Sequence, residues 1–128
     1  MNQHAFFPLP AELDSAGNLP AERQEGAWRV LPIEGAFEIV YEDSRGLWST
    51  RFLDARELKL GPGRTLIGGI DRARGGYRGF RADRIRRLTA GPERVETGIL
   101  DWLLGRAEAQ RRERVARRRK VKGAARAA

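Results

Sequence analysis

The chain has 128 residues, which is enough for one domain with a modest hydrophobic core. Basic residues outnumber acidic ones by 25 to 17, and the net charge is +8. This excess lies at one end, because residues 106–128 hold ten Arg or Lys and two Glu. The sequence therefore predicts a body without net charge and a basic C-terminal arm that could meet a polyanion.

Several classes of site are excluded by composition. The chain has no cysteine, and its single histidine is His4. Disulfides and thiolate sites are therefore absent, a zinc site would lack ligands, and a Ser-His-Asp triad would depend on His4 alone. We expect no metal, no cofactor and no enzymatic activity. Without a signal peptide or a membrane-spanning stretch, a cytoplasmic location is expected.

The N-terminal stretch, residues 1–36, is expected to be irregular because proline and glycine interrupt it repeatedly. The pattern allows a short strand from Trp28 to Leu31. Pro32 is expected to end that strand, since proline cannot donate a hydrogen bond to a sheet.

Residues 37–94 carry the two-residue alternation that is typical of half-buried strands. Residues 37–42 alternate apolar with polar side chains, and residues 47–60 resume the pattern after a turn. The alternation shifts at residues 54–57, which predicts a bulge or a bend. Three aromatic residues of these strands are expected in the core or at its rim: Tyr41, Trp48 and Phe52.

Further strands follow between glycine-rich turns. Residues 65–71 form a short apolar strand, in which the pair Gly68–Gly69 indicates a bend or a close approach of two backbones. Residues 72–76 close a hairpin, and residues 76–85 are predicted to be its second arm leading into a corner, with Phe80 in the core. Four or five strands of this length predict a mainly β fold, a small antiparallel barrel.

The periodicity becomes helical after the strands. Residues 95–120 are predicted to form an amphipathic to basic helix, with Thr97 as its N-cap. Trp102 is expected to dock this helix on the barrel. Residues 121–128 are expected to be disordered.

Five motifs follow one another in residues 37–90. They are Ile39-Val40-Tyr41-Glu42-Asp43, Ser49-Thr50-Arg51-Phe52, Leu58-Lys59-Leu60, Gly63-Arg64-Thr65-Leu66-Ile67 and Tyr77 to Ile85. This order resembles the WYL domain, a family named for a Trp-Tyr-Leu tripeptide. The resemblance implies an Sm-like or SH3-like antiparallel barrel of four to five strands, in a divergent, stand-alone member without a helix-turn-helix domain. It also implies a sensor in bacterial transcription regulation that binds a nucleotide-like or nucleic-acid ligand.

The arginine-rich stretch, residues 76–85, is the predicted ligand site. Guanidinium groups bind phosphate in a two-pronged manner and stack on bases. The candidate ligand residues are Arg78, Arg84, Arg81, Arg51 and Tyr77. The resemblance supports Arg78 and Arg84 most. Tyr77 and Phe80 could stack on bases, although Phe80 fits the core better.

A structural role for these arginines is the alternative. Arg84 would then pair with Asp83 or Asp71 and hold the corner, while Arg81 would be solvated. A hydrolase that uses Asp71 and Asp83 is poorly supported, because acids among arginines are expected to be ionised and paired.

The basic arm is the second candidate interface. Its residues are Arg111, Arg112, Arg114, Arg117, Arg118, Arg119 and Lys120. As a helix on phosphate backbones, it would bind nucleic acid in a salt-dependent way without reading sequence. The sequence thus predicts a regulatory module that binds nucleic acid or a nucleotide-like anion. The alternative is a protein-protein adaptor, whose helix and basic tail bind a partner protein.

Overall fold

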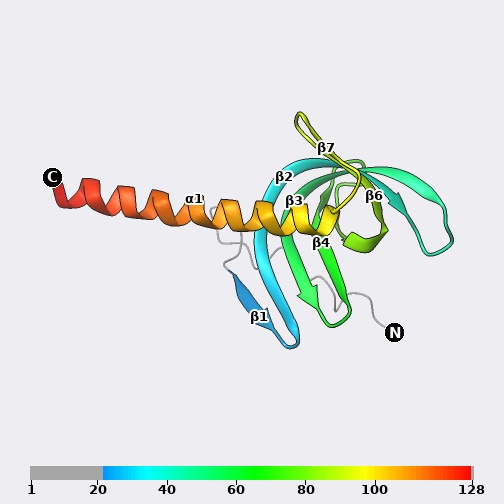
Figure 1. Ribbon diagram of the computed structural model, residues 1–128, viewed down its shortest axis with the longest axis horizontal. Helices are drawn as coiled ribbons and strands as arrows, with labels where there is room; N and C mark the ends of the chain where they lie inside the picture. The colour runs from blue at the N-terminus through cyan, green and yellow to red at the C-terminus, as the bar shows by residue number, and fades with distance from the viewer. Residues whose placement is uncertain (1–21, 128) are drawn as a thin grey trace.

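The computed structural model describes residues 22–127 and the side chains of residues 22–121. Expectations for residues 1–21 and for Ala128 lie outside this range. Within it, seven strands precede one long helix (Figure 1). The elements are β1 (Arg23–Glu25), β2 (Trp28–Glu42), β3 (Trp48–Gly61), β4 (Arg64–Asp71), β5 (Tyr77–Arg81), β6 (Ile85–Ala90), β7 (Glu93–Val95) and α1 (Ile99–Ala127).

The strands form one antiparallel sheet in the order β5-β4-β3-β2-β6-β7, and β1 pairs with the start of β2. The prediction of a mainly β, antiparallel fold with a C-terminal helix is confirmed. Within the described residues, however, the edge strands β5 and β7 do not pair with each other, so the sheet is open. There are seven strands instead of four or five, partly because β1 and β7, with three residues each, are too short to show alternation.

Strand β2 corrects the expectation that residues 1–36 are irregular. It is a single strand of 15 residues that begins at Trp28, and Pro32 does not end it. Its register with β3 shifts between Pro32 and Gly35, so the chain bulges there and tolerates the missing proline N–H. Glycine is required at this bulge because a Cβ on Gly35 would lie 2.5 Å from the ring of Phe37.

The predicted bend in the next strand is confirmed. The register between β3 and β4 shifts between Ala55 and Glu57. Gly69 lies opposite this bend, and a Cβ there would lie 2.1 Å from the backbone oxygen of Asp54. The close approach of two backbones that was expected at the two glycines therefore occurs at Gly69.

The core lies on the inner face of the curved sheet, which the first turns of α1 also cover (Figure 1). Phe80 is 3% exposed, and Ile85 and Leu88 are also buried, as expected. Residues 82–84 form a short 3-10 turn, which is the predicted corner after β5. The expectation for Trp48 and Phe52 is wrong: the alternation of β3 turns Leu53 inward and leaves these two aromatic side chains exposed.

Helix α1 begins at Ile99, four residues later than expected. The Gly98 carbonyl accepts the first helical hydrogen bond, from the Trp102 amide at 2.9 Å, so Gly98 takes the N-cap position predicted for Thr97. The helix also runs to Ala127, past the predicted end at residue 120, because alanine, arginine and lysine favour helix. No helix among the described residues combines the length and apolarity that crossing a bilayer requires.

Candidate nucleic-acid interface

The sheet divides the predicted arginine cluster between its two faces. Side chains alternate along β5, so Arg78 shares the inner face with Phe80, while Tyr77 and Arg81 lie on the outer face. Arg51 of β3 has the same orientation as Leu53 and also lies on the inner face. The structure therefore brings Arg51 and Arg78 to one face and separates them from Tyr77 and Arg81.

Arg51 is held by neighbouring side chains. Its Nη1 lies 3.6 Å from Oδ2 of Asp71, and its Nε donates a hydrogen bond to the Ser49 hydroxyl at 3.3 Å. Its guanidinium carbon lies 6.0 Å from the ring centre of Phe80. Asp71 is 1% exposed, and its other oxygen accepts the amide hydrogens of Ala73 and Arg74 in the β4-β5 turn. Arg51 therefore compensates a buried carboxylate, which is a structural task.

Arg81 is also engaged. Its Nε and Nη2 donate to the two carboxylate oxygens of Asp83 at 3.0 and 2.8 Å. This paired hydrogen bond is the main cause that lowers the pKa of Asp83 below its usual range. Asp83, which was considered as a partner of Arg84, therefore pairs with Arg81. Arg81 is not simply solvated.

Arg84 is half-buried in the 3-10 turn. It lies near two carboxylates, Asp83 and Asp43, where it adds a smaller favourable charge interaction. The main cause of the low pKa of Asp43 is a hydrogen bond from the Leu47 amide in the β2-β3 turn. Arg84 therefore faces residues of two turns and forms no ion pair with Asp71.

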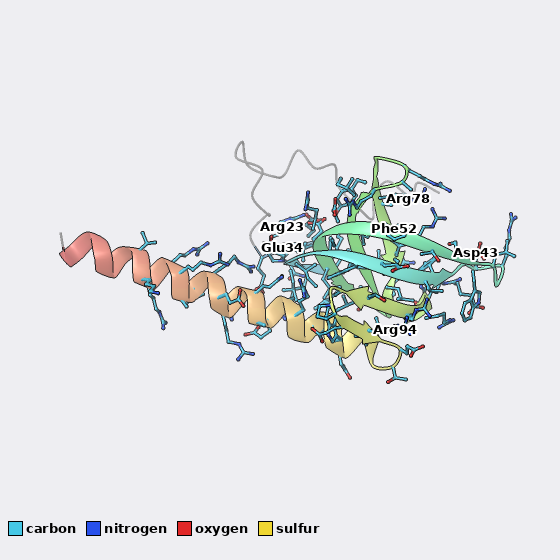
Figure 2. All side chains as sticks on the ribbon, turned by 90° about the horizontal axis from the view of Figure 1, so that it is seen from above. Arg23, Glu34, Asp43, Phe52, Arg78 and Arg94 are labelled. Atoms are coloured by element: carbon cyan, nitrogen blue, oxygen red, sulfur yellow. The ribbon has the colours of Figure 1, made fainter. Side chains whose placement is uncertain are left out.

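Arg78 differs from its neighbours. It is half-buried, and within the described residues its guanidinium has no hydrogen bond or ion pair. It projects near the β4-β5 hairpin (Figure 2). Of the predicted ligand residues on the inner face, Arg78 is the one whose charge is not already used by the fold.

Tyr77 belongs to a buried polar network that the sequence did not reveal. Its hydroxyl donates to Glu57 at 2.8 Å, and Arg23 donates to the other oxygen of Glu57 at 3.1 Å. Lys59, 1% exposed, donates to Glu25 at 3.1 Å. Alternation puts Glu57 and Lys59 on the face opposite Leu58, and only the position of β1 beside them shows that they are paired. Tyr77 is therefore committed to the fold.

The first half of α1 is fixed to the sheet. Arg106 donates to the Glu34 carbonyl at 3.0 Å, and Gln110 donates to the same oxygen at 2.9 Å. Arg106 also stacks over Phe37 and Trp102, with ring-centre distances of 5.2 and 5.5 Å. Trp102 meets Phe37 edge to face at 5.7 Å, so its predicted docking role is confirmed.

The second half of α1 projects beyond the sheet as one continuous helix (Figure 1). Its described side chains are mostly exposed: those of Arg112 and Arg117 are 74% and 73% exposed. Arg111 and Arg112 pair with Glu108 at 3.4 and 3.7 Å, and Arg117 lies 4.0 Å from Glu113. After Glu113 the sequence has seven basic residues and no acid.

Exposed aromatic residues on the outer face of the sheet are a further feature that the sequence did not reveal. Trp48 is 62% exposed and Phe52 47%. The alternation of β3 placed both on one side, but both were expected in the core of the small sheet or at its rim. Their exposure depends on the fact that no other element covers this part of the sheet among the described residues.

No cluster of potential metal ligands occurs in the described part of the chain. Comparisons of the sequence with protein-family models and curated proteins, and of the structure with solved structures, found no match. The resemblance to the WYL domain therefore stays a prediction from the residues.

Proposed function

We propose that the protein is a non-enzymatic nucleic-acid-binding module and that the projecting half of α1 is its main contact with the phosphate backbone. The observation that carries this proposal is the continuity of the helix. Hydrogen bonds to Glu34 and the stacking of Arg106 anchor its first half, so its second half presents basic side chains to solvent on a rigid support.

The charge of the arm supports a polyanionic partner. Seven basic residues follow Glu113 without an acid between them. Those with described side chains, from Arg114 to Lys120, are distributed around the helix at 3.6 residues per turn. Several arginines of the body, among them Arg23, Arg51, Arg81 and Arg86, have carboxylate partners, whereas Arg118, Arg119 and Lys120 have no ion pair within the described residues. Arginine and lysine side chains displayed in this way neutralise phosphates and release counterions.

A second anion contact on the body is proposed at Arg78, with Arg84 beside the neighbouring turn. This proposal follows the resemblance to the WYL domain, in which basic barrel residues hold a nucleic-acid or nucleotide-like ligand. The open sheet would then be a divergent form of the Sm-like or SH3-like barrel, with β2 and β3 bent as in a barrel but β5 and β7 not paired with each other. A regulatory role in the bacterial cytoplasm would follow from the same resemblance.

The adaptor alternative has less support. It would be favoured by an exposed apolar face on residues 97–107 and by an internal salt bridge of Arg78. Ile99, Leu103 and Ala107 are instead buried against the sheet, and Arg78 has no such partner among the described residues.

The arm is tested with the full chain by comparing two variants that lose the same charge. We expect Arg118→Gln with Arg119→Gln to weaken binding of an oligonucleotide and to reduce the slope of log affinity against log salt by roughly 1.4–1.8, if each arginine contacts one phosphate. The control is Arg56→Gln with Arg74→Gln on the body. Fluorescence anisotropy at several salt concentrations measures both. An equal effect of the two pairs, or none from the arm pair, would contradict the proposal.

A further inference from the structure

The exposed aromatic residues form a defined surface on the outer face of the sheet. Trp48, Thr50 and Phe52 follow one another on this side of β3, and Val40 of β2 lies opposite Thr50. We name these four residues the outer aromatic face. Trp48 and Phe52 are about 13 Å apart along the strand, at about 3.3 Å per residue. Two exposed rings on the same face of one strand are more than isolated exposed residues.

Around the outer aromatic face, most carboxylates have hydrogen-bond or ion-pair partners, whereas several arginines have no ion pair among the described residues. Arg87 lies opposite Val40, and Arg94 lies one strand further out, opposite Thr89. Of the nearby carboxylates, Glu42 accepts a hydrogen bond from Arg86 at 2.7 Å, and Asp54 lies 3.8 Å from Arg72.

Asp43 accepts two amide hydrogens of the β2-β3 turn, from Arg45 and Leu47. Glu38 is then the one carboxylate of this face that has neither an ion pair nor a hydrogen bond among the described residues. Three basic residues near this face, Arg45, Arg87 and Arg94, also have no ion pair among the described residues. The charge that remains available is therefore positive.

We infer that the outer aromatic face binds unpaired bases of a single-stranded nucleic acid, which stack on Trp48 and Phe52 while Arg87 and Arg94 meet the phosphates. This inference rests on the proposed function, because it names the form of nucleic acid. Bases of every kind have a π-face, so stacking tolerates any sequence. A duplex keeps its base faces inside the stack, so this surface favours single strands.

The two aromatic residues first considered for stacking do not compete for this role. Phe80 is buried, and the hydroxyl of Tyr77 is bound to Glu57. The outer aromatic face also lies away from the arm: Asp43 marks the hairpin tip at the end opposite the free end of α1 (Figure 2). The two surfaces therefore contact different parts of a strand, and their contributions can be measured separately.

The first test uses full-length protein, a single-stranded oligothymidylate and a duplex of the same length. We expect Trp48→Leu and Phe52→Leu each to lower the affinity for the single strand about tenfold, with the duplex affinity and the salt slope unchanged. Phe52→Tyr is the matched control and is expected to retain binding, since it keeps the ring. Leucine keeps an apolar surface, so a protein-docking face would not distinguish these variants in this way.

Tryptophan fluorescence gives a second readout. Stacking on Trp48 is expected to quench emission when the single strand is added, and Trp48→Tyr is expected to abolish the quenching but to keep most of the affinity. Circular dichroism checks that each variant is folded. We expect all of them to fold, because both side chains are exposed.

Outcomes separate the two proposals. Single-strand affinity that is unchanged in both leucine variants would overturn the inference, while loss of binding in the arm variant would leave the proposed function standing. If the wild-type protein binds neither oligonucleotide, both proposals are wrong.

Discussion

At the scale of single residues, charge pairing decides which arginines are available to a ligand. Arg51 and Arg81 have carboxylate partners, at Asp71 and Asp83, whereas Arg78 has none within the described residues. An arginine that compensates a buried acid cannot be released to a phosphate without a cost, because the acid would remain buried and uncompensated. Arg78 compensates no buried acid, so a ligand could bind it without this cost.

We expect Arg51→Ala to lower the free energy of unfolding by about 1–3 kcal/mol, because it leaves the buried Asp71 carboxylate without its cation. Arg78→Ala is expected to change stability by less than about 0.5 kcal/mol. If the proposed contact at Arg78 is correct, this variant nevertheless binds a single-stranded oligonucleotide more weakly. Urea denaturation and fluorescence anisotropy measure the two effects. Equal destabilisation by both substitutions would contradict the assignment.

At the scale of elements, α1 combines an anchored half with a projecting half. Ile99, Leu103 and Ala107 are buried, while the residues from 115 to 121 are exposed. The projecting half has no sheet to stabilise it, so its helicity depends on intrinsic propensity and on continuity with the anchored half. Gly105 is the weak point of that continuity, since glycine is a poor helix former.

Gly105→Ala is expected to stabilise the protein by about 1 kcal/mol, because alanine favours helix and a Cβ at this position meets no atom within 4 Å. Gly69→Ala is the contrasting control and is expected to destabilise, since its Cβ would strike the backbone of Asp54. Thermal and urea denaturation check the two directions. A loss of stability in Gly105→Ala would show that the helix is not continuous at this residue.

At the scale of the whole molecule, a polar network ties three strands together on the outer face. Arg23 and Glu25 of β1 bind Glu57 and Lys59 of β3, and Tyr77 of β5 binds Glu57. Burial raises the pKa of Glu25, but hydrogen bonds from Arg23 and Lys59 outweigh this effect and lower the net pKa below 4.5.

The lowered pKa of Glu25 predicts how stability depends on pH. The folded state favours the ionised carboxylate, so its contribution is complete above pH 4.5 and is lost as the pH falls through the lower folded pKa. We expect Glu25→Gln to cost about 1–2 kcal/mol at neutral pH and to weaken the decline of stability in acid. Glu96→Gln, exposed and outside the network, is the control. Identical acid profiles of wild type and Glu25→Gln would contradict this.

The sequence alone determined strands β3 and β4, the bend at residues 54–57, the inward position of Phe80 and the anchored helix. These features depend on local periodicity and on glycine, which act over neighbouring residues. It also determined that the charge lies at the C-terminal end. Short strands and the passage of β2 through Pro32 escaped detection, because a bulge and the pairing of distant strands make them possible.

Only the tertiary structure decided which side chains of the candidate site act together. Alternation shows that Arg78 and Tyr77 point to opposite faces. Only the pairing of distant strands shows that Tyr77 hydrogen-bonds to Glu57 and that Arg51 pairs with Asp71. Likewise, the sequence pattern places aromatic residues of a strand in the core or at its rim. The arrangement of the sheet leaves Trp48 and Phe52 uncovered. Burial and ion pairing depend on contacts between segments far apart in sequence, so local sequence patterns do not determine them.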